Sequence, residues 1–237
     1  MEKYIIDIHC HMLYGVDDGA ISPHMSLEML KSAAGQGIGA VIMTPHYRPE
    51  MFEYDPDRIK EAFAYVSGEA EKLGVSVFTG CEYHVDGDIV ENLSKGRCPT
   101  LAGSDHVLTE YSYSTGYAKI RGTSEELLSN GYTPVIAHAE RYEVFINKPE
   151  LLGEFRSMGA MIQINADSVI GKEGIRAKRL CRKIIKEHLA DIIASDSHNM
   201  TDRRCNMKEC REYIVRKYGE DRAKRLFEIN PGRIIGR

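Results

Sequence analysis

The sequence lacks the features that mark membrane-spanning, nucleic-acid-binding and disordered chains. No apolar run approaches the roughly 20 residues that a membrane-spanning helix needs. The formal net charge is only −4, which gives no global reason to bind nucleic acid or an anionic membrane surface. Linkers, low-complexity tracts and internal repeats are also missing. We therefore expect one α/β domain over residues 1–237, with neither nucleic acid nor a membrane as its partner.

The cysteines are scattered along the chain, and their spacing shows no disulfide framework. The N-terminus reaches an acidic residue too early for a signal peptide. We therefore expect reduced thiols and a cytoplasmic location. The six cysteines stand at positions 10, 81, 98, 181, 205 and 210.

Two cysteine–arginine pairs have the CxxxxxR spacing of cysteine-dependent tyrosine phosphatases: Cys205 with Arg211, and Cys210 with Arg216. In those enzymes a loop of free backbone N–H groups wraps the phosphate before a helix begins. Here residues 206–210 contain no glycine and enter a helical pattern. We therefore expect no thiolate mechanism.

Short apolar runs alternate with helical patterns along the chain, which is typical of a parallel α/β fold. Seven strands are predicted, at residues 4–9, 40–43, 75–79, 107–108, 135–137, 161–164 and 192–194. Ser22-Pro23 and Asp55-Pro56 are helix-start signals, and they predict helices that end near residues 36 and 73. Further helices are expected near residues 125–130, 150–158, 177–188, 208–217 and 221–229.

The first strand-to-helix turn, residues 10–19, has no GxGxxG fingerprint. An open dinucleotide-binding sheet would carry that fingerprint at this turn. We therefore expect a closed or distorted seven-stranded (β/α) barrel.

Histidines and carboxylates follow nearly every predicted strand. In a parallel barrel all the strand C-termini open on one face, so these side chains should converge. Residues i and i+2 of an extended chain point the same way, which lets His9 and His11 share one ion. Imidazole and carboxylate ligands suit Zn²⁺, Mn²⁺ or Fe. The nine candidate metal ligands, enough for two or three ions, are His9, His11, Asp18, His46, Glu82, Glu110, His138, Asp196 and His198.

Four other histidines, His24, His84, His106 and His188, have no such context, and we expect them to bind no metal. Of these four, His84 has the shortest sequence separation from a candidate ligand, because it lies two residues beyond Glu82.

Together these motifs resemble the polymerase-and-histidinol-phosphatase (PHP) superfamily. More narrowly, the chain is similar to the bacterial PHP-type protein-tyrosine phosphatases of capsule and exopolysaccharide operons. The narrower resemblance covers essentially the whole chain, including Asn230-Pro231 near its end. It rests on four segments: YGVDDGA at 14–20, TPHY at 44–47, AHAERY at 137–142 and DSHN at 196–199.

The resemblance implies a distorted seven-stranded barrel and a site for three metal ions, often Mn²⁺, with Fe, Zn²⁺ or Mg²⁺ as alternatives. It implies one ion held by His9, His11, Glu82 and Asp196, a second held by Glu82, Glu110 and His138, and a third held by Asp18, His46 and His198. It also points to Arg141 and Arg203 as phosphate-binding cations. The sequence does not separate Asp17 from Asp18, or Arg203 from Arg204.

The expected function is a metal-dependent phosphomonoesterase that hydrolyses phosphotyrosine by metal-activated hydroxide. The expected partner is a tyrosine-phosphorylated protein, a bacterial tyrosine kinase tail, in the control of capsule or exopolysaccharide synthesis. The alternative is hydrolysis of L-histidinol phosphate in histidine biosynthesis. A PHP nuclease or proofreading module is disfavoured by the acidic charge balance. A non-catalytic docking module is disfavoured by the complete ligand set.

Overall fold

The computed structural model describes residues 4–237 with the exception of 53 and 86. All strand pairs of its two sheets are parallel. The smaller sheet has the order β1 (Ile5–Cys10), β2 (Ile38–Met43), β4 (Ser76–Thr79). The larger sheet has the order β3 (His46–Tyr47), β5 (Glu82–His84), β6 (His106–Glu110), β7 (Thr133–Ile136), β8 (Met161–Asn165), β9 (Ile192–Ala194).

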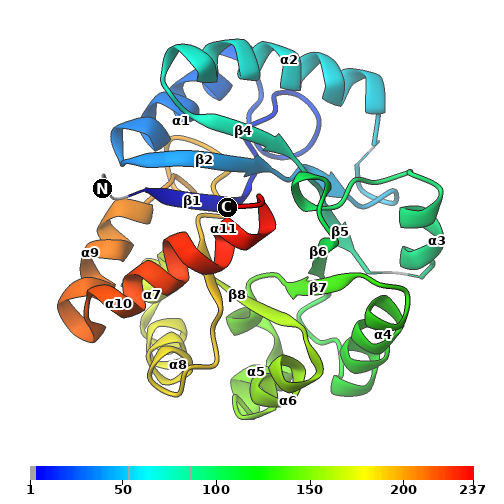
Figure 1. The fold of residues 1–237 in the computed structure, drawn as a ribbon, viewed down its shortest axis with the longest axis vertical. Coiled ribbons are helices and arrows are strands. Elements are labelled where there is room, and N and C mark those ends of the chain that lie inside the picture. Colours follow the sequence, from blue (N-terminus) through cyan, green and yellow to red (C-terminus); the bar gives the residue numbers. More distant parts are fainter. Residues whose placement is uncertain (1–3, 53, 86) are drawn as a thin grey trace.

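The two sheets curl around a common centre (Figure 1). An isolated parallel bridge between Cys10 and Ser197 links the end of β1 to the segment after β9. β2 and β4 lead through short connections into β3 and β5, so the chain passes from the smaller sheet to the larger one twice. The result is an α/β fold with a curled parallel sheet.

Each of the seven predicted strands has a counterpart in the structure. The barrel of seven strands is not confirmed, because the described residues form nine strands in two sheets. The two strands that were not predicted, β3 and β5, are only two and three residues long. Neither contains an apolar run, which is the signal from which the other seven strands were predicted.

Two helices begin as their sequence signals predict. The Ser22 hydroxyl accepts a hydrogen bond from the backbone N–H of Met25 at the start of α1 (Pro23–Gly35). The Asp55 carboxylate accepts two backbone N–H bonds at the start of α2 (Pro56–Lys72). In both helices the proline stands in the first turn, where no intrahelical N–H bond is lost.

Most of the remaining helices lie around the sheets, and the last helix of the chain, drawn in red, crosses in front of their centre (Figure 1). Their bounds are α3 (Ile89–Ser94), α4 (Tyr117–Ser129), α5 (Glu143–Asn147), α6 (Leu151–Met158), α7 (Ala166–Ile170), α8 (Ile175–Lys186), α9 (Met207–Tyr218), α10 (Glu220–Lys224) and α11 (Asn230–Ile234), with the short turns η1 (Leu101–Gly103), η2 (Ala139–Arg141) and η3 (Arg225–Ile229). The helices predicted from the sequence correspond to α4, α6, α8, α9, and α10 together with η3, whereas α3, α5, α7 and α11 were not predicted. Among the described residues, every helix is too short or too polar to traverse a lipid bilayer.

The core leaves one end of the curled sheets for polar side chains. Ile8, Leu108 and Ile192, from three different strands, belong to one buried apolar cluster, and Ile234 of α11 belongs to it as well. α11 also contacts β1 directly. Apolar residues therefore fill the interior, while polar side chains gather at and just beyond the C-terminal ends of the strands.

Candidate metal centre

The nine side chains proposed as metal ligands from the sequence lie together at the C-terminal ends of the strands. His9 is in β1, and β3, β5 and β6 contribute one residue each. The others stand in the segments that follow β1, β7 and β9. Each of the nine has at least one close nitrogen–oxygen contact with another member of the set.

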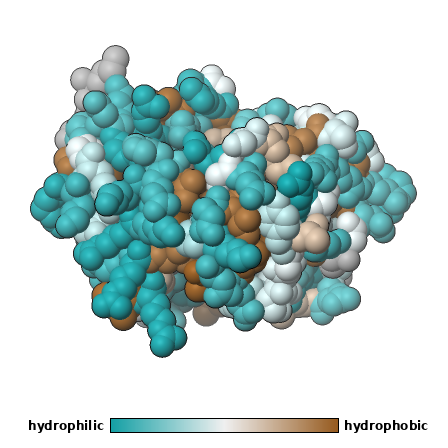
Figure 2. Space-filling model, turned by 90° about the horizontal axis from the view of Figure 1, so that it is seen from below, coloured by the Kyte–Doolittle hydropathy of each residue, from teal (hydrophilic) through white to brown (hydrophobic). Residues whose placement is uncertain are grey.

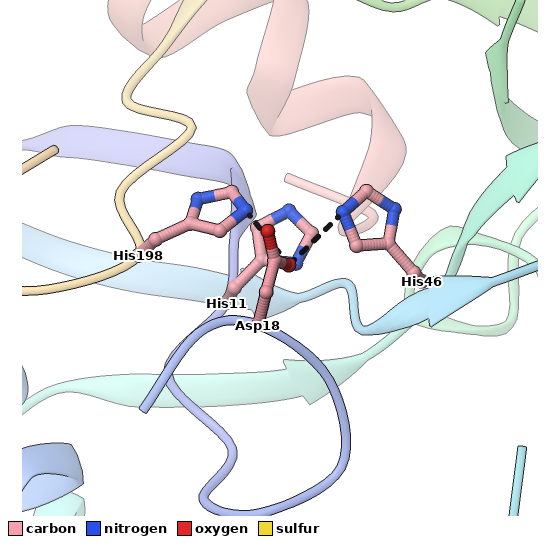
Figure 3. A group of neighbouring side chains, drawn as sticks. All are labelled: His11, Asp18, His46 and His198. Carbon is pink, nitrogen blue, oxygen red and sulfur yellow. Dashed lines mark ion pairs between the residues drawn. The ribbon is translucent and has the colours of Figure 1, made fainter. Parts of the chain in front are cut away.

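Three groups within this set place one potential ligand atom per residue close enough for a shared ion. The first contains His11, Asp18, His46 and His198, and Figure 3 shows its three imidazole rings around the Asp18 carboxylate. Asp18 Oδ1 lies 3.4 Å from His46 Nε2 and 3.5 Å from His198 Nε2. The second group is His9, His11 and Asp196, and the third is His46, Glu82 and Glu110.

Glu82 lies at the centre of the cluster and contacts four histidines. Its Oε2 is 3.2 Å from His9 Nε2, 3.4 Å from His11 Nε2 and 3.1 Å from His46 Nδ1. Its Oε1 is 2.9 Å from His138 Nε2. Burial raises the pKa of this carboxyl, but the neighbouring imidazoles outweigh burial and hold the pKa well below its usual value. Glu82 is therefore an ionised carboxylate that contacts four histidines from three segments of the chain.

Hydrogen bonds behind the cluster fix which nitrogen of His9 faces inward. The backbone N–H of His138 can only donate, and it donates to Oε1 of Gln163 over 2.9 Å. The same oxygen lies 3.2 Å from Nδ1 of His9, which therefore carries the hydrogen. Nε2 of His9 is left with a lone pair, which points at the Glu82 and Asp196 carboxylates.

His11 is oriented in the same way by Asp17. The Asp17 carboxylate lies 2.8 Å from Nδ1 of His11, so the lone pair of His11 is also on Nε2. The Nε2 atoms of His9 and His11 are 3.3 Å apart, and both approach the same carboxylate oxygen of Glu82. Burial lowers the pKa of each imidazole, but nearby carboxylates outweigh it and raise the pKa above the usual value. The cluster thus attracts cations, whether protons or metal ions.

The structure distinguishes the adjacent aspartates by their contacts. Asp17 is buried, and its carboxylate also accepts the backbone N–H groups of Gly19 and His46. This burial applies to the Asp17 side chain, whereas the Asp18 side chain is about half exposed and faces the imidazoles of the first group. Gly19 permits this turn, because a Cβ there would lie 2.2 Å from the backbone oxygen of His11. Asp18 therefore stands in the candidate centre and Asp17 behind it.

Several buried atoms in the cluster have no hydrogen-bond partner among the described residues. They include His46 Nδ1, Glu82 Oε2 and His198 Nε2. Buried polar atoms without partners are rare, and a bound ion is one of the few explanations for a group of them. Burial and the neighbouring His11 lower the pKa of His198 to about 4, which keeps this imidazole in the neutral form that binds metals. The donor set therefore fits divalent metal ions.

Two arginines complete the site. Nη1 of Arg141 lies 2.9 Å from one oxygen of Asp196, and Nη2 of Arg203 lies 3.2 Å from the other. Both arginines line a hollow of about 150 Å³ above the cluster, together with Phe52 and Tyr113. We call it the central hollow. Arg204, which the sequence did not separate from Arg203, lines a different depression.

No cysteine lines the central hollow among the described residues. All six are free and buried. Cys210 lies inside α9, and burial raises the pKa of both its thiol and that of Cys205. A thiol with a raised pKa is a poor nucleophile near neutral pH.

Sequence reasoning missed the residues that support the cluster and one that touches it. Gln163 and Asn165, in β8, hold three of the candidate ligands between them, and their alternation within a buried strand was the available signal. His84, which we expected to bind no metal, places its Nδ1 3.0 Å from Oε2 of Glu110.

Comparisons of the sequence identify similar proteins along nearly the whole chain. The sequence model of the family described as "Capsular polysaccharide synthesis, CpsB/CapC" matches residues 5–236. The tyrosine-protein phosphatase CpsB of Streptococcus pneumoniae is 35% identical and aligns over 98% of each chain. The tyrosine-protein phosphatase YwqE of Bacillus subtilis is 30% identical over 94% of this chain and 89% of its own.

Solved structures show the same likeness. A structure from the set of YwqE from Bacillus subtilis and CpsB from Streptococcus pneumoniae, described as unique metal-dependent tyrosine phosphatases, has a TM-score of 0.91. It is 28% identical and covers 98% of this chain and 94% of its own. An organophosphorus hydrolase variant from Deinococcus radiodurans has a TM-score of 0.65 at 13% identity, with 98% and 93% covered, which is a likeness of fold alone.

Proposed function

The chain belongs to the CpsB/CapC family of capsular polysaccharide synthesis, and from that premise we propose that it is a metal-dependent protein-tyrosine phosphatase. The observation that carries the proposal is the facing pair of imidazole nitrogens, Nε2 of His9 and Nε2 of His11, at 3.3 Å. Both lone pairs point at the ionised Glu82 carboxylate, which is an arrangement that a cation satisfies. The related proteins named above are tyrosine phosphatases, one set of them metal-dependent.

The donor groups support three adjoining ions, with Mn²⁺ expected and Fe, Zn²⁺ or Mg²⁺ as alternatives. We propose that His9, His11 and Asp196 hold one ion, and that Glu82 bridges from it towards Glu110 and His138. The third ion would lie among Asp18, His46 and His198. His11 and His46 each lie within reach of two of the groups. Because Nδ1 of His11 is bonded to Asp17, the one free lone pair of His11 would serve a single ion, which we propose is the ion shared with His9.

Divalent ions bound there would lower the pKa of a coordinated water and neutralise the charge of the transferring phosphoryl group. Arg141 and Arg203 would bind phosphate oxygens with their planar guanidinium forks. Asp196 contacts both guanidinium groups, so they are oriented before the substrate arrives. The aromatic rings of Phe52 and Tyr113, which line the same hollow, would flank the phenyl ring of the substrate.

We further propose that residues 1–237 act as one domain and that the two sheets together serve as the distorted barrel that the resemblance implies. The substrate would be the tyrosine-phosphorylated tail of a bacterial kinase, dephosphorylated in the cytoplasm to regulate capsule or exopolysaccharide synthesis. The capsular description of the family and the names of the relatives support this setting.

The alternative substrate, L-histidinol phosphate, and the alternative mechanism, a cysteine nucleophile, have less support. Hydrolysis of L-histidinol phosphate has no counterpart in the names of the relatives, which are tyrosine phosphatases. A cysteine nucleophile would have to leave a buried position, and its thiol has a raised pKa.

The proposal is tested by phosphate release from a tyrosine-phosphorylated peptide. The protein is first treated with EDTA, dialysed, and then supplied with Mn²⁺, Fe²⁺, Zn²⁺ or Mg²⁺ in separate samples. We expect activity to disappear on chelation and to return with at least one ion. Full activity in the EDTA-treated, metal-free protein would refute the metal mechanism.

A further inference from the structure

A second hollow, of about 400 Å³, opens beside the candidate metal centre. Its apolar wall is formed by Tyr113, by Ile146 of α5, and by Ala177 and Leu180 of α8. We call it the side pocket. Its volume is in the range of pockets that bind small ligands, which starts near roughly 300 Å³. Figure 2 views the face on which α5, α6 and α8 lie, and apolar side chains gather among hydrophilic ones near the middle of that face.

The side pocket adjoins the central hollow. Tyr113 and Arg141 line both. Arg141 is held between Asp196, on the side of the metal centre, and Glu173, on the side of the pocket. Glu173 is in turn fixed by the Ser168 hydroxyl, which donates to it over 2.7 Å. A peptide whose phosphate contacts Arg141 would therefore have its neighbouring residues at the mouth of the side pocket.

The charges around the side pocket argue against a second anionic ligand. Its lining carries two arginines, Arg141 and Arg176, and two glutamates, Glu140 and Glu173. Arg141 is already paired with Glu173 and Asp196. The formal charges balance, so the pocket offers no excess positive charge for a second phosphate. What remains is apolar surface, with Tyr113 and Ile146 each more than half exposed.

We propose that the side pocket binds an apolar side chain of a residue adjacent to the phosphotyrosine of the substrate peptide. This inference rests on the proposed phosphatase function. It adds a preference among phosphotyrosine peptides of different sequence, which the metal centre cannot supply. The phosphate would be recognised by Arg141 and the metal centre, and the apolar neighbour by Ile146, Ala177 and Leu180. Burying an apolar side chain in a preformed pocket favours the peptide that carries it over one that does not.

The test compares five phosphotyrosine peptides and a substrate without flanking residues. The host peptide has only glycine and serine around the phosphotyrosine. Each of the other four peptides replaces one of these residues with leucine, at the second or first position before the phosphotyrosine or at the first or second position after it. Phenyl phosphate is the substrate without flanking residues. We expect leucine at one position or more to raise kcat/KM about tenfold, as a hydrophobic pocket does for a matching side chain.

Three variants identify where the gain arises. Ile146→Ala removes part of the wall and Ala177→Phe fills the pocket, so both should abolish the leucine gain and leave phenyl phosphate hydrolysis unchanged. Ile175→Ala is the matched control, because Ile175 is an exposed isoleucine at the start of α8 that does not line the side pocket. This control should keep the full gain.

The outcomes separate the inference from the function on which it rests. Equal rates for all five peptides in the wild-type protein would overturn the inference and leave the phosphatase function standing. An equal loss of the gain in Ile146→Ala and Ile175→Ala would overturn it as well. Hydrolysis of phenyl phosphate together with failure on every peptide would contradict both the inference and the protein-phosphatase function.

Discussion

The side-chain oxygen of Gln163 accepts hydrogen bonds from Nδ1 of His9 and from the backbone N–H of His138, over 3.2 and 2.9 Å. One uncharged residue of β8 thereby orients two candidate ligands that follow different strands. Its amide nitrogen donates to Asn165, whose own amide donates to Asp196 over 2.8 Å. β8 contributes none of the nine candidate ligands and yet positions three of them.

Gln163→Met should weaken metal binding while the nine ligands stay in place. The variant keeps a similar side-chain length but removes the acceptor that holds His9 in its inward-facing tautomer. We expect metal affinity to fall about 10–100-fold, the usual effect of losing a partner behind a ligand. Titration of the metal-free protein with Mn²⁺ measures this. The matched control is Gln36→Met. Gln36 stands at the end of α1, and its side-chain amide donates to the backbone oxygen of Cys205. Unchanged affinity in Gln163→Met would contradict the positioning role.

Glu82→Gln should affect more than one ion. The substitution replaces a carboxylate that contacts four imidazoles with a neutral amide of the same shape. We expect the loss of at least one bound ion per chain and a fall in kcat of at least about 100-fold, as when one preorganised electrostatic contact is removed. Metal analysis and kinetics are measured on the same sample, with the exposed Glu91→Gln as control. Full metal content with persisting hydrolysis would show that Glu82 does not bridge.

Arg203→Ala and Arg204→Ala should behave differently although the residues are adjacent. Arg203 lines the central hollow and contacts Asp196, whereas Arg204 lines another depression. We expect kcat/KM for a phosphotyrosine peptide to fall about 100-fold or more in Arg203→Ala, the usual effect of losing one charge-stabilising contact. Arg204→Ala should stay close to wild type. Similar losses in both variants would remove the basis for assigning phosphate binding to Arg203.

His198 gives the metal-free protein a pH-dependent stability. Its folded pKa of about 4 is below the ordinary value of 6.5, so the unfolded chain takes up this proton first as the pH falls. This stabilising contribution is therefore complete above pH 6.5 and is lost towards pH 4. Between about pH 7.5 and about pH 5, the wild type should lose about 2 kcal/mol more stability than His198→Gln. Urea unfolding in EDTA measures the difference, and parallel pH profiles would contradict the prediction.

The sequence predicted the elements that depend on strong local signals. Proline after Ser22 and after Asp55 predicted two helix starts, and apolar runs predicted seven of the nine described strands. β3 and β5 were missed because their pairing is set by the curl of the sheet and not by a run of apolar residues. They carry His46 and Glu82, which were found only because both follow longer strands.

The convergence of the site was predictable, and its finer arrangement was not. Parallel strands bring their C-terminal ends to one face, so the nine residues had to meet there. The choice between Asp17 and Asp18 depends on a turn whose geometry requires Gly19, and periodicity carries no information on it. Gln163 has no charge and lies in a buried strand, where it resembles any strand residue until its two partners are in place.

The most direct test of the account compares two substrates on one enzyme preparation. Phosphate release with added Mn²⁺ is measured from a phosphotyrosine peptide and from L-histidinol phosphate at the same concentration, in the wild type and in Cys205→Ser. We expect a clear preference for the peptide, abolished by EDTA and retained in the cysteine variant. A preference for L-histidinol phosphate, or loss of activity in Cys205→Ser with its metal content intact, would contradict it.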